Sequence, residues 1–301
     1  MPTLTHNEYL EALVHEFMGS PANDNAMPTG PEAAFDTPLI GFAAGGDPIW
    51  EQIKAEAATN HWTPLEAFRL AYPEEEATAD DLSVVSWVLP QTAATREDQR
   101  RATLYACERW IRNRYVAQVR VVDELARFVI GRLDADGVKA ASPDLLPEWK
   151  RFKDEKFTIS SLWSHRHAAF AAGLGTFGLS DGLITKAGKA MRCGSVVVRL
   201  KARPTPRPYS GYNDYCLFYN SGLCGKCVKR CPCEAITLAG HDKNKCSDYL
   251  DNVVTPAIAA AYPDIAGAYG CGLCQAAVPC ENSIPPRPPK SVRRELEKAN
   301  I

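Results

Sequence analysis

The chain has 301 residues, 11 cysteines and a formal net charge of −2. This length accommodates one large domain or two ordinary ones, and the near-zero charge gives no reason to expect nucleic acid as a partner. The first residues, MPTLTHNEYLEALVHEF, lack the basic start and apolar core of a secretory signal, and no apolar run reaches the ~18 residues of a membrane span. We therefore expect a cytoplasmic protein without membrane contact, in which a cysteine-rich tract is more typical of metal binding than of disulfides.

The first two hundred residues have the pattern of an α/β domain. Short apolar or β-branched runs at 38–45, 82–90 and 194–200 predict buried strands. Between Arg96 and Leu133 an apolar stripe with steps of three or four residues predicts one bent helix or two, ended by Gly137. The stripe consists of Leu104, Cys107, Ile111, Tyr115, Val119, Val122, Ala126, Val129 and Leu133.

A glycine-rich segment lies before the last of these strands. The stretch from Ser161 to Leu200 predicts a helix capped by Ser160 or Ser161, then a glycine-rich turn, a loop and the strand. The glycines of AGLGTFG match G-x-G-x-x-G, but a dinucleotide fingerprint requires a strand before the glycines and a helix after them. Here the order is reversed, so the glycines alone indicate a turn or close packing.

A proline-rich stretch from Lys201 to Asp214 separates this part from the rest. Its three prolines disfavour both a helix interior and a central strand. Only two cysteines precede residue 216, whereas nine lie between 216 and 280. We therefore predict a first domain at 1–205 and a small cysteine-rich domain at 206–301, which ends in an amphipathic helix over 290–301.

The cysteines have the spacing of iron–sulfur ligands. Cys224, Cys227 and Cys231-Pro232 form C-x2-C-x3-C-P, most of the run found in bacterial two-cluster ferredoxins. Because the fourth cysteine of each group serves the other cluster in that pattern, we predict two [4Fe–4S] clusters. The first takes Cys216, Cys224, Cys227 and Cys280, and the second takes Cys246, Cys271, Cys274 and Cys231.

Zinc binding and disulfide formation account for these cysteines less well. A zinc-ribbon module would use the two C-x2-C pairs, but it does not account for Cys231-Pro232 or for the presence of eight candidate ligands. Disulfides are disfavoured in a reducing compartment. Cys233 is left over and could replace a neighbouring ligand.

The order of these motifs resembles the epoxyqueuosine reductase family and is similar to the related reductive dehalogenases. The resemblance is carried by AAGLGTFGLSDGLIT, GSVVVRL, the C-x2-C-x3-C-P run and the later CGLC, and more weakly by PLIGFAAGGDPIW and SVVSWVLP. It implies a nitroreductase-like domain that binds cobalamin, followed by a ferredoxin-like domain with two clusters. The corrinoid contacts that it implies are Gly173, Leu174, Gly175, Gly178, Ser180, Leu183, Ile184, Thr185, Ser195, Val196 and Val197.

One departure from the family concerns the proton donor. The resemblance places Arg166 at a family arginine, but the position of the family's aspartate is occupied by Ile159. Reduction of epoxyqueuosine in tRNA is therefore not expected, and the substrate should be different. His165, which titrates in the useful range, is the candidate catalytic proton donor.

Taken with the resemblance, the residues predict a reductase that cleaves a C–O or C–halogen bond of a small molecule. Electrons would come from an external low-potential donor of the ferredoxin or flavodoxin type and pass through both clusters to the corrinoid. Three alternatives stay open: an electron-transfer protein, a corrinoid-handling protein without substrate turnover, and a flavin-dependent reductase.

Overall fold

The computed structural model describes residues 4–56, 60–155 and 158–287, which belong to two compact units. The first unit consists of Met1–Leu89, Val116–Leu174 and Arg192–Pro208, and the second of Pro90–Tyr115, Gly175–Met191 and Tyr209–Ile301. The mixture of helices and sheets confirms the predicted α/β class. Because each unit combines three chain segments, the single boundary predicted after residue 205 stays a prediction. The helix predicted over 290–301 lies outside the described residues.

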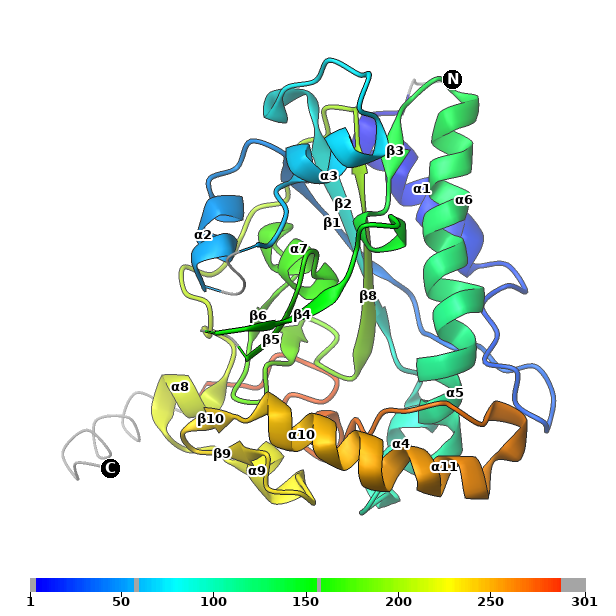
Figure 1. The fold of residues 1–301 in the computed structure, drawn as a ribbon, viewed down its shortest axis with the longest axis vertical. Coiled ribbons are helices and arrows are strands. Elements are labelled where there is room, and N and C mark those ends of the chain that lie inside the picture. The colour runs from blue at the N-terminus through cyan, green and yellow to red at the C-terminus, as the bar shows by residue number, and fades with distance from the viewer. Residues whose placement is uncertain (1–3, 57–59, 156–157, 288–301) are drawn as a thin grey trace. The chain divides into compact units, whose positions relative to one another are not determined.

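A four-stranded sheet forms the centre of the first unit (Figure 1). Its order is β1 (Leu39–Ala44), β2 (Ser83–Pro90), β8 (Met191–Val198) and β3 (Ala140–Ala141). The pairs β1–β2 and β3–β8 are antiparallel. Three of these strands coincide with the apolar runs of the sequence, which confirms those predictions.

One face of the sheet packs against helices α1 (His6–Met18) and α6 (Glu124–Ala135), which lie against each other. Along β2 the side chains alternate between the two faces, so that Val85, Trp87 and Leu89 enter this core. Trp87 is fully buried, and a side chain on Gly194 of β8 would collide with its indole ring. Each large apolar side chain buried in this way contributes about 1.5–3 kcal/mol to folding.

Two further helices lie outside this core and contact each other. Helix α7 (His165–Ala171) contacts β1 and α2 (Ile49–Glu56), and the rings of Trp50 and Trp163 stack with centroids 5.6 Å apart. Helix α3 (Pro64–Ala71) follows α2 in the sequence and begins with a capping box formed by Thr63 and Glu66.

The helical run predicted from Arg96 to Leu133, as one bent helix or two, contains a break. Helix α4 (Ala93–Arg101) ends in an extended residue, Ala102, and the chain resumes as α5 (Glu108–Ala117). A π-helical segment, Gln118–Asp123, then joins α5 to α6. Leu104 lies in the break and is 61% exposed, and Tyr115 and Val119 are also exposed, so these three members of the predicted stripe were wrong. The stop was correct: Gly137 has φ 74° and its N–H donates to the carbonyl of Asp134.

The helix before the glycine-rich segment begins later than predicted. Ser160 and Ser161 belong to β5 (Thr158–Ser161), which pairs with β4 (Arg151–Asp154) in a hairpin. Helix α7 starts only at His165, after Ser164. The prediction of a serine cap at 160 or 161 was therefore wrong, because pairing in the hairpin places both residues in extended conformation.

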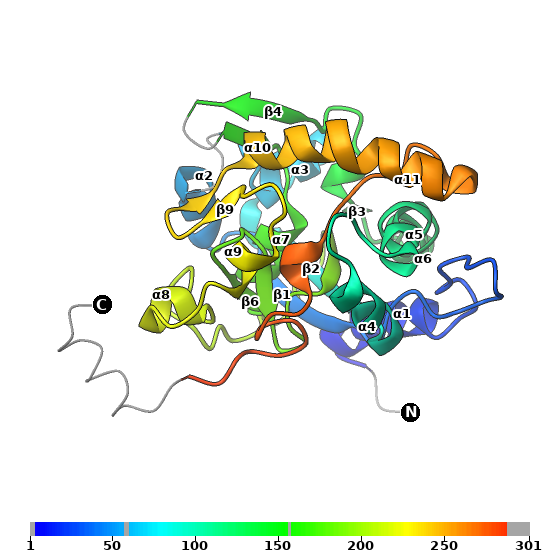
Figure 2. The same ribbon diagram turned by 90° about the horizontal axis from the view of Figure 1, so that it is seen from below.

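The second unit consists of short elements. Strands β6 (Gly175–Phe177) and β7 (Leu183–Thr185) form a hairpin, as do β9 (Ile236–Thr237) and β10 (Gly240–His241). Helix α10 (Lys243–Tyr249), a π-helical segment and α11 (Thr255–Ala261) form one continuous rod (Figure 2). Every residue of α8 (Leu217–Ser221), α9 (Lys226–Arg230) and α10 is at least partly exposed. No helix in the described ranges has the length and apolar character to span a membrane.

Candidate metal centre

Four cysteines of the second unit line one cavity, which we call the four-thiol cavity. They are Cys216, Cys224, Cys227 and Cys280, the set that the spacing predicted for a first cluster. The empty space, including the part open to solvent, is about 380 Å³. Apart from Lys189, the wall is largely apolar and includes Leu179, Ile184, Phe218 and Val278.

The chain brings Cys216 to this cavity by a short helix. Cys216 immediately precedes α8, and its N–H donates to the carbonyl of Asn213. Gly222, with φ 68°, ends α8 in the left-handed conformation that glycine adopts without strain. After this turn the chain continues to Cys224 and then into α9. Helix α8 therefore spans the interval between Cys216 and Cys224, which is longer than the spacing in the ferredoxin run.

The thiols of the cavity influence one another electrostatically. Burial raises the pKa of Cys280 to about 11, and the charges of Cys216, Cys227 and Cys224 add to the increase while Lys189 opposes it. Burial also raises the pKa of Cys227, again against Lys189. Apolar burial and like charge disfavour free thiolates here, so a positively charged group is required to stabilise all four in the ionised form.

A second thiol group contains the other predicted ligands. Burial raises the pKa of Cys246 to about 12, with further increases from Cys274, Cys233 and Cys231. Burial likewise raises the pKa of Cys271 to about 12, with contributions from Cys274, Cys246 and Cys231. Cys231, Cys246, Cys271 and Cys274 therefore lie near enough to influence one another electrostatically, and their assignment to one cluster stays a prediction.

Cys233 lies beside this second group. Its Sγ is 3.7 Å from that of Cys231, and burial raises its pKa. All 11 cysteines are free thiols. Within the described ranges, no three His, Cys, Asp or Glu side chains converge closely enough to enclose a single metal ion. The donor set, two groups of thiols with four predicted ligands each, fits iron–sulfur clusters, which are held by thiolates on separate irons.

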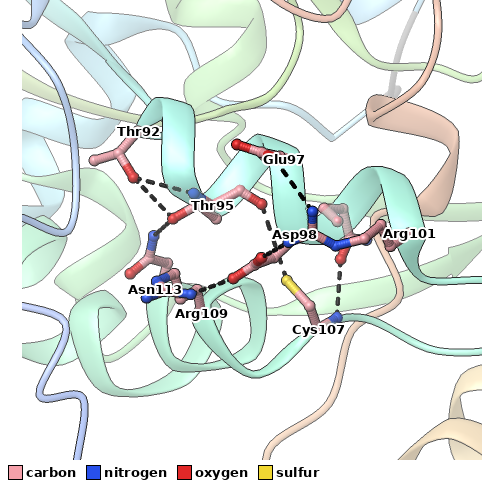
Figure 3. Close-up of polar contacts among 9 residues, drawn as sticks. Thr92, Thr95, Glu97, Asp98, Arg101, Cys107, Arg109 and Asn113 are labelled. Atoms are coloured by element: carbon pink, nitrogen blue, oxygen red, sulfur yellow. Dashed lines mark hydrogen bonds and ion pairs between the residues drawn. The ribbon is translucent and has the colours of Figure 1, made fainter. Parts of the chain in front are cut away.

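A buried glutamine anchors the second thiol group to the α4–α5 corner. Gln99 accepts a hydrogen bond from the N–H of Cys107 at 2.9 Å and donates to the carbonyl of Cys271 at 2.8 Å. Figure 3 shows this corner, where Cys107 also faces Thr95. Burial raises the pKa of Cys107 to about 11, so this thiol is protonated and unreactive at neutral pH.

The turn that carries Cys271 and Cys274 has a strict requirement for glycine. Gly272 has φ 64°, and a side chain there would overlap the indole of Trp110. The N–H of Gln275 donates to the carbonyl of Gly272 and closes the turn that contains Cys274. Trp110 and Gln99 thus position the C-x2-C pair from two sides.

His165 lies in the first unit, with both ring nitrogens hydrogen-bonded. Its Nε2 is 2.7 Å from Oδ2 of Asp144, and its Nδ1 is 2.8 Å from the hydroxyl of Ser195. Nε1 of Trp163 donates to the same hydroxyl, so the proton of Ser195 remains available for Nδ1 of His165. Although burial alone would raise the pKa of Asp144, its interactions with His165 hold it below the ordinary value.

The glycine-rich segment packs on its own chain. A side chain on Gly173, which has φ 78°, would lie 2.8 Å from the carbonyl oxygen of Pro206, and one on Gly175 would overlap the carbonyl of Ile184. Gly178 would similarly meet the side chain of Ile184. These glycines therefore serve close packing in the described structure.

The predicted corrinoid contacts are divided between the units. Gly173, Leu174 and residues 195–197 belong to the first unit, and the others to the second. The hydroxyls are engaged within the protein: Ser180 with Lys189, Thr185 with the carbonyl of Gly188, and Ser195 as described above. The remaining members, Leu183, Ile184, Val196 and Val197, are buried. The three hydroxyls thus have internal partners in the described structure, and corrinoid binding by this set stays a prediction.

The sequence reasoning missed several residues that organise the thiols. Lys189 lines the four-thiol cavity, Gln99 binds the backbone of Cys271, and Glu281 anchors the segment after Cys280. Glu281 is buried, accepts from Nε of Arg100 at 2.9 Å and accepts from the N–H of Ala277. None belongs to a motif, since each acts across a large sequence separation.

Comparison with known proteins gives structural similarity alone. No family model matches the sequence, and no curated protein does. Similar solved structures include an epoxyqueuosine reductase from Streptococcus thermophilus, with 13% identity and a TM-score of 0.49 over 95% of this chain and 69% of the other. An epoxyqueuosine reductase with a tRNA-Tyr stem loop has 16% identity and a TM-score of 0.47 over 95% and 68%. A structure described as suggesting a mechanism for B12-dependent dehalogenation by a reductive dehalogenase has 15% identity and a TM-score of 0.47, over 97% of this chain and 38% of its own. The chain is thus similar to both kinds of reductase.

Proposed function

We propose that the chain is an iron–sulfur oxidoreductase that uses two [4Fe–4S] clusters to deliver electrons for a reduction. The observation that carries this proposal is the four-thiol cavity, in which cysteines 216 and 280, far apart in sequence, share one wall with Cys224 and Cys227. The second thiol group supports it, because its members are the cysteines that the two-cluster ferredoxin pattern assigns to the second cluster.

The residues of the chain have separate roles in this proposal. The eight cysteines would hold the clusters, which accept and release single electrons when bound. The apolar wall formed by Leu179, Ile184 and Val278 limits the access of water to the first group. Gln99 and Trp110 position the second group through the backbone of 271–274.

Anaerobic reconstitution with iron and sulfide tests the clusters. We expect about eight iron and about eight sulfide atoms per chain. Cys227→Ser and Cys271→Ser should each lower the iron content by about half, because each removes a ligand from a different cluster. Cys107→Ser is the matched control and should retain the full content. Binding of zinc without sulfide would contradict the proposal.

The finer assignment follows the sequence resemblance. We propose that the electrons reach a corrinoid and that a C–O or C–halogen bond of a small molecule is reductively cleaved, with an external low-potential ferredoxin or flavodoxin as donor. Cobalt retained after reconstitution with cobalamin, with a base-off Co(II) signal in electron paramagnetic resonance, would support this assignment. Turnover that persists without the corrinoid would contradict it.

A second candidate function is electron transfer without substrate turnover. It is favoured by the hydroxyls of Ser180, Thr185 and Ser195, which are hydrogen-bonded within the protein instead of facing an open cradle. Full clusters without retained cobalt, together with rapid electron exchange with a ferredoxin, would favour this candidate over the reductase.

His165 is the proposed proton donor of the reductase. To donate a proton to a substrate, one ring nitrogen must exchange its present partner, Asp144 or Ser195, for the substrate. We expect His165→Ala to lower turnover at least about a hundredfold, within the range that general acid catalysis supplies. The iron content should be unchanged. His167→Ala, two residues away, is the control, and equal turnover of the His165 variant and the unmodified protein would remove the assignment.

A further inference from the structure

A buried lysine lies in the wall of the four-thiol cavity. Lys189 is 2% exposed, and its ammonium donates to the hydroxyl of Ser180 at 2.5 Å. It shares the cavity wall with all four cysteines of the first group. A lysine is almost never fully buried unless its charge is compensated, so its position requires an explanation.

The chain holds this lysine in place through its backbone. The N–H of Lys189 donates at 2.8 Å to the backbone carbonyl of Cys280, which is one of the predicted ligands. The neighbouring N–H of Ala190 donates to Glu281 at 3.0 Å, and Glu281 is in turn anchored by Arg100. Lys189 and Cys280 are therefore positioned by the same backbone contact.

A glycine makes room for the lysine stem. A side chain at Gly182, in the turn between β6 and β7, would lie 2.8 Å from Cε of Lys189. The same turn carries Ser180, which receives the ammonium hydrogen bond. The hairpin thus covers the stem and presents one neutral partner to the charged end.

The compensating charge would come from the thiols when they serve as ligands. Cys216, Cys224, Cys227 and Cys280 line the same cavity as Lys189, and cluster ligands are thiolates. The negative charge of such thiolates would stabilise the buried ammonium beside them.

We propose that Lys189 is a fixed positive charge that raises the reduction potential of the cluster held in the four-thiol cavity. The inference rests on the proposed function. Reduction adds one electron, and so one negative charge, to the bound group, and a nearby cation stabilises the reduced form more than the oxidised form. Lys189 is a positioning residue for the electron and transfers no proton in this role.

The test is a redox titration of the reconstituted full chain, followed by electron paramagnetic resonance. In Lys189→Met the midpoint potential of one cluster should become more negative, while that of the other should change less. Lys226→Met is the matched control, because Lys226 adjoins Cys227 but is exposed, where solvent and salt screen its charge. Its potentials should stay close to those of the unmodified protein.

A second variant separates charge from hydrogen bonding. Lys189→Gln removes the charge but retains a donor for Ser180, so it should show the same negative shift as Lys189→Met. It also supplies the measurement if the methionine variant loses iron. Unchanged potentials in a glutamine variant with full clusters would overturn the inference and leave the clusters intact. Absence of iron and sulfide from the unmodified protein would instead overturn the proposed function.

Discussion

The two units differ in what holds them together. In the first unit a sheet buries large side chains such as Trp87, Phe42 and Leu125 in one extended core. In the second unit the helices α8, α9 and α10 have only partly exposed or exposed residues, and a small apolar cluster surrounds Leu179, Ile184, Cys216 and Ile236. The first unit is therefore stabilised by one extended apolar core, whereas the helices that carry the thiols of the second unit bury little apolar area and depend on polar anchors and on whatever binds the thiols.

The largest effect that we expect is a selective loss of order after removal of iron. An anaerobic chelator should lower the protection of backbone amides in 216–280 by more than about 2 kcal/mol of opening free energy, because binding of a metal centre contributes directly to folding. Amides of α1 and α6 in the same sample should keep their protection and serve as the internal control. Hydrogen exchange with mass spectrometry measures both. Equal loss in the two units would refute the contrast.

Truncation of Trp87 should destabilise the first unit and leave the iron content of the second unchanged. Trp87→Ala leaves a cavity between β2 and the helices, and we expect a loss of about 3–5 kcal/mol from the first unit. Chemical denaturation followed by circular dichroism measures the loss, and the iron content should be retained. Val119→Ala, at a residue that is 60% exposed, is the control and should change stability by less than about 0.5 kcal/mol. A similar cost for both variants would contradict the burial argument.

The smallest expected effect concerns pH and His61. Burial lowers the pKa of this histidine to about 4, against 6.5 in the unfolded chain. Its Nδ1 contacts the carbonyl of Trp62, and its Nε2 accepts from the N–H of Ser164, which keeps the ring neutral. Because the unfolded chain binds the proton first, the contribution is fully present above pH 6.5 and decreases as the pH falls toward 4.

Between pH 6.5 and pH 5 this histidine should cost the first unit about 2 kcal/mol. The melting temperature, measured at both values, should therefore fall more in the unmodified protein than in His61→Gln, which carries no titrating ring. His15→Gln, on the exposed side of α1, is the control and should retain the full decrease. An identical decrease in all three proteins would show that His61 does not account for the pH dependence.

The strands could be predicted because their apolar runs are largely buried. Burial of every residue of β2 produces a continuous signal that needs no tertiary information. For 96–133 one bent helix or two stayed open, and the position of the break at Ala102 could not be predicted, because Leu104 fits the helical period and the break is stabilised by the contact of Gln99 with Cys107. The late start of α7 has the same origin, since pairing of β5 with β4 overrides the capping signal of Ser160 and Ser161.

The thiol groups could be predicted because ligand spacing is local. The run from Cys224 to Cys231 contains one short α-helix, and the pair Cys271 and Cys274 is carried by a 3-10 turn. Lys189 could not be found from spacing, because its role depends on Gly182 and on the backbone contact with Cys280, 91 positions away. The pattern of the glycine-rich segment does not separate two interpretations. It is compatible with ligand contact and with the close packing of Gly173 and Gly175 that is observed.

The three-segment composition of the second unit has a consequence for dissecting the protein by truncation. A fragment starting at residue 206 would contain all eight predicted ligands, and by ferredoxin standards it would look like a self-sufficient module. It would nevertheless lack Lys189, Gln99 and Arg100, whose segments belong to the same compact unit. The cysteine-rich portion is therefore not a detachable cassette, and exchanging it between proteins would require transplanting 90–115 and 175–191 with it.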